Sequence, residues 1–169
     1  MCRKKEPPRS FVYPWKKVAD HAVGSLLQVG YAEDSDLLLV LSHNGRGIFD
    51  CLTGERIARD SKSHVYDHFK PNKLLAAGFD VLAGQQIRVA GLHGGGLALS
   101  TEDNWFLELR KKNDEVFLSK AAPIKDKDYA LVGDGRLCEL RALGFSETGR
   151  SFVIATSCSL IIFAREILS

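Results

Sequence analysis

Several features that would point to a particular class of protein are scarce or missing in this chain. Its 169 residues include only 5 prolines, 4 cysteines and 1 methionine. No apolar run approaches the ~20 residues that a membrane-spanning helix needs, and the cysteines form neither a CxxC pair nor a Cys/His set with zinc spacing. The 23 basic and 21 acidic residues leave a net charge of only +2, so the charge carries no global nucleic-acid signature.

Motifs that carry catalytic chemistry are also absent. His93-Gly94-Gly95-Gly96 copies the letters of the HGGG oxyanion loop of lipases and esterases, but the GxSxG motif that must supply the nucleophile does not occur. Neither GxGxxG nor a P-loop is present. We therefore expect a non-catalytic protein without a cofactor or a metal, in which the three glycines form a β-turn or bulge.

The composition is that of one globular domain, with 45% hydrophobic and 26% charged residues. Residues 1–20 carry most of the charge asymmetry, because six of their side chains are basic and two are acidic. No apolar segment of a secretory signal follows the basic start. We expect a solvated basic leader over residues 1–20 and a cytoplasmic protein with reduced cysteines, although any two of the four could form a disulfide.

The rest of the chain, residues 21–169, repeats one pattern of apolar strands and turns. Equivalent positions recur at separations of 58 and 56 residues, as in Ser42, Ser100 and Thr156, and in Ile48, Phe106 and Ile162. Periods of this length are typical of propellers and other repeat arrays. We predict a single β domain of three repeats at about 21–60, 81–122 and 136–169, in which Leu39, Leu97 and Val153 occupy matching inward positions.

Each repeat is predicted to be a four-stranded β-meander. Turn signals separate the apolar runs at Asn44-Gly45, Thr53-Gly54 and 112–114. The third repeat has no room for a fourth strand before Ser169, so we expect it to borrow one from residues 10–20. The fold class expected is all-β, as a partial propeller, a small barrel or a sandwich.

One short helix is expected in the irregular connection between residues 60 and 80. Pro71 disfavours a helix through Lys70. The run from Asn72 to Gly78 is the better candidate, because Gly78 could close a helix at its C-terminus.

Two segments resemble the repeats of known β-propellers. The residues Ile48-Phe49-Asp50-x-x-Thr53-Gly54-Glu55-Arg56-Ile57-Ala58 resemble the step from inner to outer strand in WD-type and quinoprotein-type blades. Phe145-Ser146-Glu147-Thr148-Gly149-Arg150, followed by an apolar strand, resembles the start of such a blade. The resemblance covers about residues 26–58 and 140–165 and implies a blade-like architecture without a specific function. Closed propellers have four or more blades, and this chain has three candidates and no Trp-Asp dipeptide.

Six residues are candidates for binding a partner. Trp105 aligns with Gly47 and Ile161, which places it at a turn edge where we expect it to be exposed. His64, Tyr66 and His68 lie in one short segment, where two imidazoles on one helical face could hold a metal or act as acid and base. Asp34 and Asp36 belong to an acidic turn that lacks the frame of a calcium loop.

The most consistent function is a non-catalytic protein-binding module, such as an adaptor or an immunity protein that blocks a toxin. The alternative is an enzyme or a nucleic-acid-binding protein that uses the segment His64–His68 and the basic N-terminus. We expect a protein partner or self-association rather than nucleic acid or a membrane. The expected interface is the edge formed by the first and third repeats, together with the apolar tail residues Ile167 and Leu168.

Overall fold

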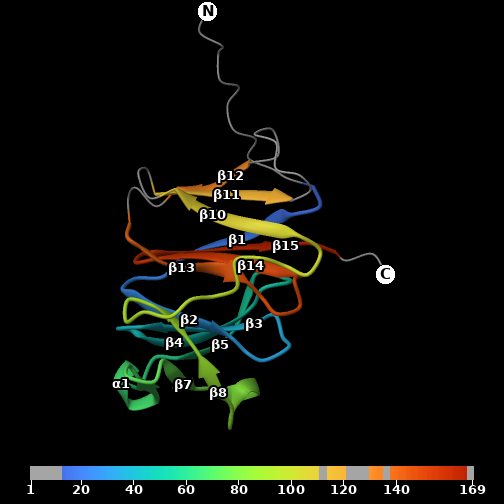
Figure 1. Cartoon of the computed structure of the whole chain (residues 1–169). Coiled ribbons are helices and arrows are strands. Elements are labelled where there is room, and N and C mark those ends of the chain that lie inside the picture. Colours follow the sequence, from blue (N-terminus) through green and yellow to red (C-terminus); the bar gives the residue numbers. More distant parts are fainter. Residues whose placement is uncertain (1–12, 111–113, 121–129, 135–137, 167–169) are drawn as a thin grey trace, which may run out of the picture.

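In the described part of the chain, the strands form four small antiparallel sheets that stack as successive layers (Figure 1). The computed structural model describes residues 13–110, 114–120, 130–134 and 138–166. We name the sheets A (β1, β13, β14 and β15), B (β2, β3, β4, β5 and β9), C (β6, β7 and β8) and D (β10, β11 and β12). They stack in the order D, A, B, C. The all-β class expected from the sequence is confirmed.

The first and third predicted repeats are four-stranded meanders in sheets B and A. Sheet B contains β2 (Leu26–Tyr31), β3 (Leu37–Ser42), β4 (Gly45–Asp50) and β5 (Glu55–Asp60). Sheet A contains β13 (Leu140–Phe145), β14 (Ser151–Thr156) and β15 (Ser159–Ala164). The turns expected at Asn44-Gly45 and Thr53-Gly54 join β3 to β4 and β4 to β5.

The fourth strand of sheet A comes from the N-terminal part of the chain. Strand β1 (Lys16–Ala22) pairs antiparallel with β15, from Lys16 opposite Ala164 to Ala22 opposite Ser159. The expected borrowed strand is therefore present, shifted toward the C-terminal end of the predicted window. The leader expected over residues 1–20 is wrong for Lys16–Asp20, because these residues are hydrogen-bonded to β15; residues 1–12 lie outside the described part.

Sheets A and B stack head to tail, because equivalent residues point in the same direction along the stack. In sheet B, Leu39 and Ile48 face sheet C, and their equivalents in sheet A, Val153 and Ile162, face sheet B. On the opposite faces, Phe49 of sheet B packs toward sheet A, and its equivalent Phe163 packs toward sheet D. The predicted equivalence of the first and third repeats is confirmed at these positions.

The second predicted repeat is not a four-stranded meander. Sheet D has three strands, β10 (Trp105–Arg110), β11 (Glu115–Lys120) and β12 (Ala130–Asp134). Leu97 lies in no strand and Phe106 is 38% exposed on β10, so both predicted core equivalences are wrong. Three consecutive glycines before Leu97 leave no side chains that a central strand could bury. The turn expected at 112–114 lies outside the described residues except for its last position.

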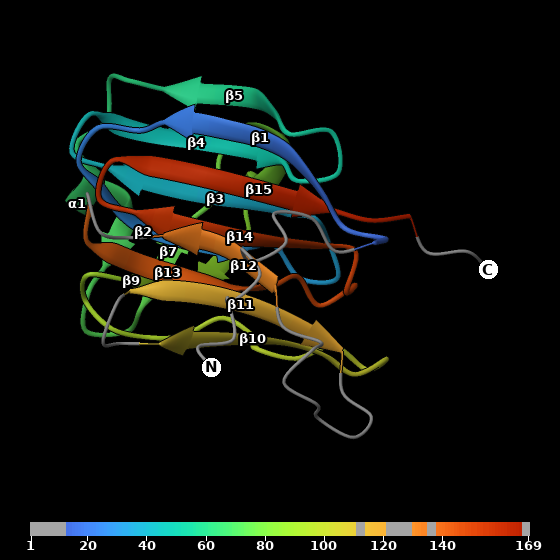
Figure 2. The ribbon, with the colours of Figure 1, turned by 90° about the horizontal axis from the view of Figure 1, so that it is seen from above.

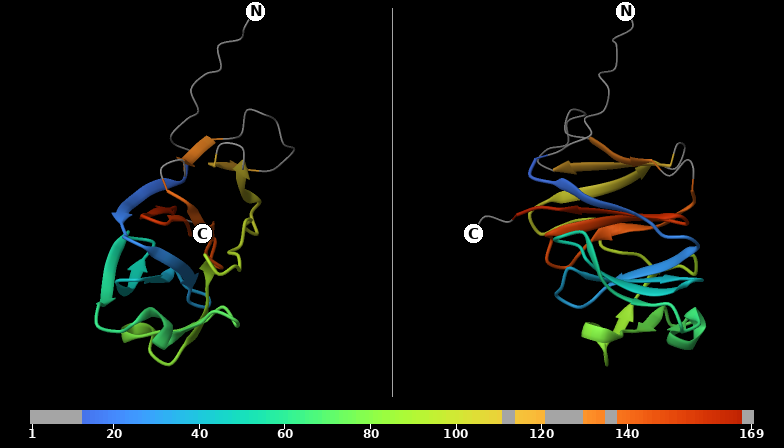
Figure 3. Two further views of the ribbon diagram at one scale, coloured as in Figure 1. Left: turned by 90° about the vertical axis from the view of Figure 1, so that its left-hand side faces the viewer. Right: turned by 180° about the vertical axis from the view of Figure 1, so that it is seen from behind.

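Residues 88–100 instead run past β2 of sheet B, β13 of sheet A and β10 of sheet D. The short strand β9 (Ala90–Gly91) pairs with β2, Phe145 of β13 donates its N–H to the Ala98 carbonyl, and Leu107 of β10 donates to Leu99. The left view of Figure 3 shows this segment along one side of the stack. The edges of β2, β13 and β10 that face it are therefore partly covered by the chain itself.

Glycines on the inner strands allow the 88–100 segment to approach the backbone closely. A Cβ added at Gly30 would overlap the Arg88 carbonyl oxygen, and one added at Gly144 would overlap Leu97. The two glycines occupy equivalent positions in the first and third repeats, so the repeated glycine is explained by the same contact in both.

We expect Gly30→Ala to lower the free energy of unfolding by about 1–3 kcal/mol, because the added methyl group must displace backbone at Arg88. Gly96→Ala is the matched control, since no atom lies within 4 Å of a Cβ at Gly96. This control should be neutral or slightly stabilising. Urea denaturation of both variants measures the difference, and equal stabilities would contradict the explanation.

Sheet C closes the far end of the stack and contains the connection between residues 60 and 90. Its strands are β6 (Phe69–Lys70), β7 (Leu75–Ala77) and β8 (Gln86–Arg88), preceded by helix α1 (Val65–His68) and interrupted by the 3-10 turn η1 (Asp80–Leu82). The expected short helix exists, but its predicted position after Asn72 is wrong. His64 and Asp67 form a capping box that begins the helix earlier.

Cys138 and Cys158 form a disulfide that joins the segment just before β13 to the β14–β15 turn. The expectation that all cysteines are reduced is therefore wrong for this pair, while Cys51 is free and buried. None of the helices in the described ranges has the length and hydropathy that crossing a bilayer requires.

The outer edges of sheets A and B are formed by β1 and β5, which lie together on one side of the stack (Figure 2). The faces of the first and third repeats pack against each other, so they do not form the open apolar edge that was expected. The edge strands carry exposed charges such as Lys17 and Arg59, which discourage pairing with another strand. Ile167 and Leu168 lie outside the described residues.

Candidate functional site

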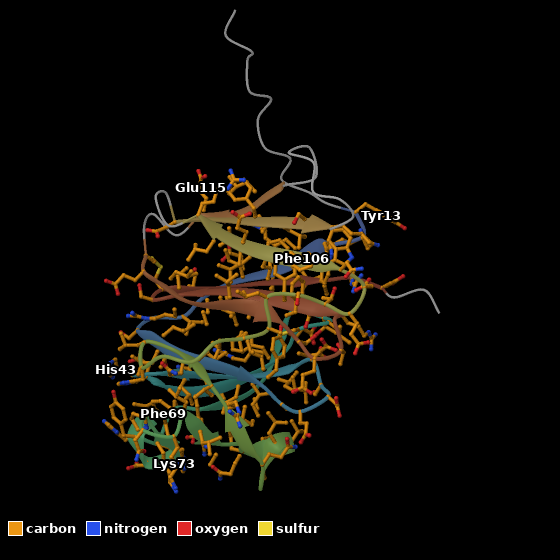
Figure 4. The ribbon with its side chains drawn as sticks, in the orientation of Figure 1. Tyr13, His43, Phe69, Lys73, Phe106 and Glu115 are labelled. Carbon is orange, nitrogen blue, oxygen red and sulfur yellow. A yellow bond between two sulfur atoms is a disulfide. The ribbon has the colours of Figure 1, made fainter. Side chains whose placement is uncertain are left out.

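A groove of about 780 Å³ opens where the ends of sheets A and D meet. Its walls come from the residues around β1 and the end of β15, from the turn before β10, and from the end of β11. Tyr13 stands at its rim with 77% of its surface exposed (Figure 4). The volume lies within the range of typical binding pockets.

The groove is organised around the ion pair of Arg165 and Asp103. The Arg165 guanidinium donates two hydrogen bonds, of 2.6 and 2.8 Å, to the two Asp103 carboxylate oxygens, and a third of 2.9 Å to the Gly149 carbonyl. The fork is bidentate, which fixes its orientation. The hydrogen bonds from Arg165 hold the pKa of Asp103 well below its usual range, so this carboxylate is charged at neutral pH.

Two tryptophans support the buried guanidinium. Its central carbon lies 4.7 Å from the Trp15 ring centroid and 5.9 Å from that of Trp105, within the range of cation–π attraction. The two indoles meet edge to face, with centroids 5.9 Å apart. Both indole N–H groups are buried and lack a hydrogen-bond partner in the described part of the chain, which is uncommon for buried tryptophans.

Basic side chains outnumber acidic ones around the groove, four to two. Because Arg165 is neutralised by Asp103, the remaining positive charge belongs to Lys16, Lys120 and Arg150. These three side chains are exposed, and no salt bridge joins any of them to a carboxylate of the described residues. The Lys120 ammonium lies 5.4 Å from the Trp105 ring centroid. The groove therefore favours a negatively charged ligand.

The predicted exposure of Trp105 is wrong, since only 4% of its surface is accessible. Residues alternate along β10, and Trp105 points into the layer between sheets A and D while Phe106 points outward. Trp105 nevertheless lines the groove. The sequence analysis missed Arg165 and Asp103, which are 62 residues apart and show no local motif.

The candidates His64, Tyr66 and His68 lie around α1, at the other end of the stack. His64 is the N-cap of the helix, and its ring lies against that of Tyr66 with centroids 5.7 Å apart; within the described residues, neither a hydrogen bond nor a ring contact joins it to His68. Tyr66 instead lies beside the loop residue His93, with 3.3 Å between the phenol oxygen and Nε2. The His93 N–H donates to the Gln28 side-chain oxygen at 2.7 Å, which holds this loop on sheet B.

Asp34 and Asp36 differ in their accessibility. Asp36 is only 7% exposed, and it accepts hydrogen bonds from the Ser151 and Thr148 hydroxyl groups at 2.6 and 2.8 Å. Because both carboxylate oxygens are used to join sheets A and B, Asp36 has a structural role here, and its role in binding a partner stays a prediction. Asp34 is exposed, and its backbone N–H donates to Glu147 at 3.1 Å.

Neither a metal centre nor a known family accounts for the site. Within the described residues, no group of three or more His, Cys, Asp or Glu side chains is placed to hold a metal ion. Comparisons with protein-family models, curated proteins and solved structures gave no match. The resemblance to propeller blades therefore stays a prediction.

Proposed function

We propose that this chain is a non-catalytic protein-binding module, of the adaptor or immunity-protein kind, that binds an acidic segment of its partner in the groove between sheets A and D. The observation that carries the proposal is the arrangement of Lys16, Lys120 and Arg150 around a rigid ion pair and two tryptophans. Three cations without a carboxylate partner among the described residues supply the attraction. The Arg165–Asp103 pair, with its guanidinium buried and its carboxylate half exposed, supplies a fixed wall.

A protein segment fits the groove better than a nucleic acid does. Apolar side chains of Pro14, Val18 and Leu52 line part of the groove and suit the apolar side chains of a peptide. The alternative, an enzyme or nucleic-acid-binding protein built on His64 and His68, loses support because neither a hydrogen bond nor a ring contact joins the two imidazoles in the described part of the chain.

The Cys138–Cys158 disulfide argues against the cytoplasmic location expected from the sequence. Structural disulfides persist in oxidising compartments and are rare in the cytosol. An oxidising environment is therefore the better match for this chain, and it suits an inhibitor or adaptor that acts outside the cytosol.

The test is fluorescence anisotropy with a labelled ten-residue peptide of alternating glutamate and leucine. We expect the triple variant Lys16→Gln/Lys120→Gln/Arg150→Gln to bind it at least tenfold more weakly than the unaltered chain. The control variant Lys62→Gln/Lys73→Gln/Arg88→Gln removes the same charge from exposed positions on sheet C and its connections, and it should bind within about twofold of the unaltered chain.

Two outcomes would overturn the proposal. Equal losses in both triple variants would show that only the net charge of the protein matters. A ten-nucleotide single-stranded RNA that binds more tightly than the peptide, and depends on the same three residues, would assign the groove to nucleic acid instead. Its affinity should then fall steeply with salt.

A further inference from the structure

A second, smaller hollow lies between sheets A and B beside the outer strand β5. Its volume is about 200 Å³, and Val23, Val40 and Phe49 form its apolar wall. Gly47 of β4 also lines it, and the equivalent of Gly47 in sheet A is Ile161. In sheet A that isoleucine packs between layers, whereas Gly47 has no side chain to extend into the hollow, and Phe49 and Arg56 lie beside it.

Two guanidinium groups reach the rim of this hollow from β5. Arg56 is opposite Phe49 and Arg59 is opposite Gly47 in the β4–β5 register. Cross-strand partners share a face of the sheet, and the register shift between Ile48 and Phe49 brings two arginines three residues apart to the same face. Both therefore face the layer that contains the hollow, and both line it.

These arginines have no acidic partner in the described part of the chain. The nearby carboxylate of Asp60 is taken by Arg46, with 2.9 Å between Nε and Oδ2. Arg46 also donates to the Ala77 carbonyl, which directs it toward sheet C. The positive charge at the hollow therefore comes from Arg56 and Arg59 and is not compensated there.

The polar groups beside the arginines are already satisfied by the chain. The Ser42 hydroxyl donates to the Gly45 carbonyl, and the Asn44 side-chain amide donates to the Gly24 carbonyl. The hollow therefore has more hydrogen-bond donors than acceptors, and it is smaller than most small-molecule pockets. Both properties suit a compact anion. Guanidinium groups bind phosphate with matched bidentate geometry.

We propose that the hollow over Gly47 binds a phosphate group, with Arg56 and Arg59 as its ligands. The phosphate could be free or could belong to a phosphorylated side chain, and the two sources share this chemistry. The site is separate from the groove, because the two share no lining residue.

Isothermal titration with inorganic phosphate, at constant ionic strength, tests this proposal. We expect saturable binding to the unaltered chain and at least a tenfold higher Kd for Arg56→Gln/Arg59→Gln. The pair Lys73→Gln/Arg88→Gln removes two exposed cations elsewhere and should leave the Kd within about twofold. The groove variant Lys16→Gln/Lys120→Gln/Arg150→Gln should also retain phosphate binding, which separates this proposal from the function proposed for the groove.

A second variant tests the hollow without changing charge. An added Cβ at Gly47 would have its nearest neighbours at 3.4–3.7 Å, so Gly47→Ala fits, and Gly47→Val should fill the space. We expect Gly47→Val to weaken phosphate binding at least fivefold, with Gly47→Ala intermediate. Parallel titration with phosphoserine distinguishes a phosphorylated side chain, which should bind more tightly than phosphate. No saturable binding of either ligand, or equal losses in the control pair, would overturn the proposal.

Discussion

Replacing Phe152 with alanine should lower the free energy of unfolding by about 3–5 kcal/mol, the cost of removing a fully buried aromatic side chain. Phe152 is inaccessible to solvent in the layer between sheets A and D. Its ring stacks on Phe163 with centroids 4.5 Å apart and also meets Trp15 at 4.9 Å. The substitution would leave a cavity surrounded by aromatic rings that their own contacts hold in place. The surrounding side chains can therefore move little to fill it.

Phe106→Ala is the matched control, because it removes the same side chain from the outward face of β10. Phe106 is 38% exposed, and we expect its loss to cost less than about 1 kcal/mol. Urea denaturation at 25 °C measures both changes. A large loss at Phe106 with a small loss at Phe152 would mean that the sheets do not stack as described. It would restore Phe106 to the core position predicted from the repeat.

Reduction of the Cys138–Cys158 disulfide should destabilise the chain by about 3 kcal/mol. The two cysteines are 20 residues apart. In the chain-entropy model, closing a loop of that length lowers the entropy of the unfolded chain and so stabilises the folded state by about 3 kcal/mol at 25 °C. The bond also holds the start of β13 to the β14–β15 turn, where the Ser157 N–H donates to the Glu139 carbonyl. Sheet A should therefore be the part most affected.

Unfolding with and without dithiothreitol measures the effect. The unaltered chain should lose stability on reduction, whereas Cys138→Ser/Cys158→Ser should already have the lower stability and should not respond. Cys51→Ala, which removes the free buried thiol, should respond to reduction as the unaltered chain does. Equal stability of the unaltered chain in both conditions, with the bond shown by mass spectrometry to be oxidised at the start, would contradict this account.

Local sequence determined much of the sheet structure of this protein. Asn44-Gly45 and Thr53-Gly54 mark hairpin turns because their backbone preferences act over a few residues. The repeat of apolar strands placed Ile48 and Ile162 at equivalent positions, and both lie in the core. The strand expected from residues 10–20 is present as β1, which pairs with β15, since a sheet edge of that kind is normally paired or protected.

The failures of the sequence analysis have equally physical causes. Leu97 fits the apolar pattern of a strand, but the preceding glycines let residues 88–100 follow the edges of three sheets instead. Helix α1 begins at His64 because a capping box outweighed the weak helical pattern after Asn72. In both cases the sequence pattern was only a statistical preference. A specific contact of the 88–100 segment, or a specific helix cap, decided the structure instead.

Only the tertiary structure decided where the functional candidates lie. The ion pair of Arg165 and Asp103 and the pair of Trp15 and Trp105 join segments distant in sequence. The stacking of sheets D and A alone brings them to one groove. The sequence analysis predicted an exposed Trp105, but the side chain points inward, because a one-residue change in alignment moves a strand side chain to the opposite face. Periodicity shows which residues alternate, and packing against a neighbouring sheet decides which face is buried.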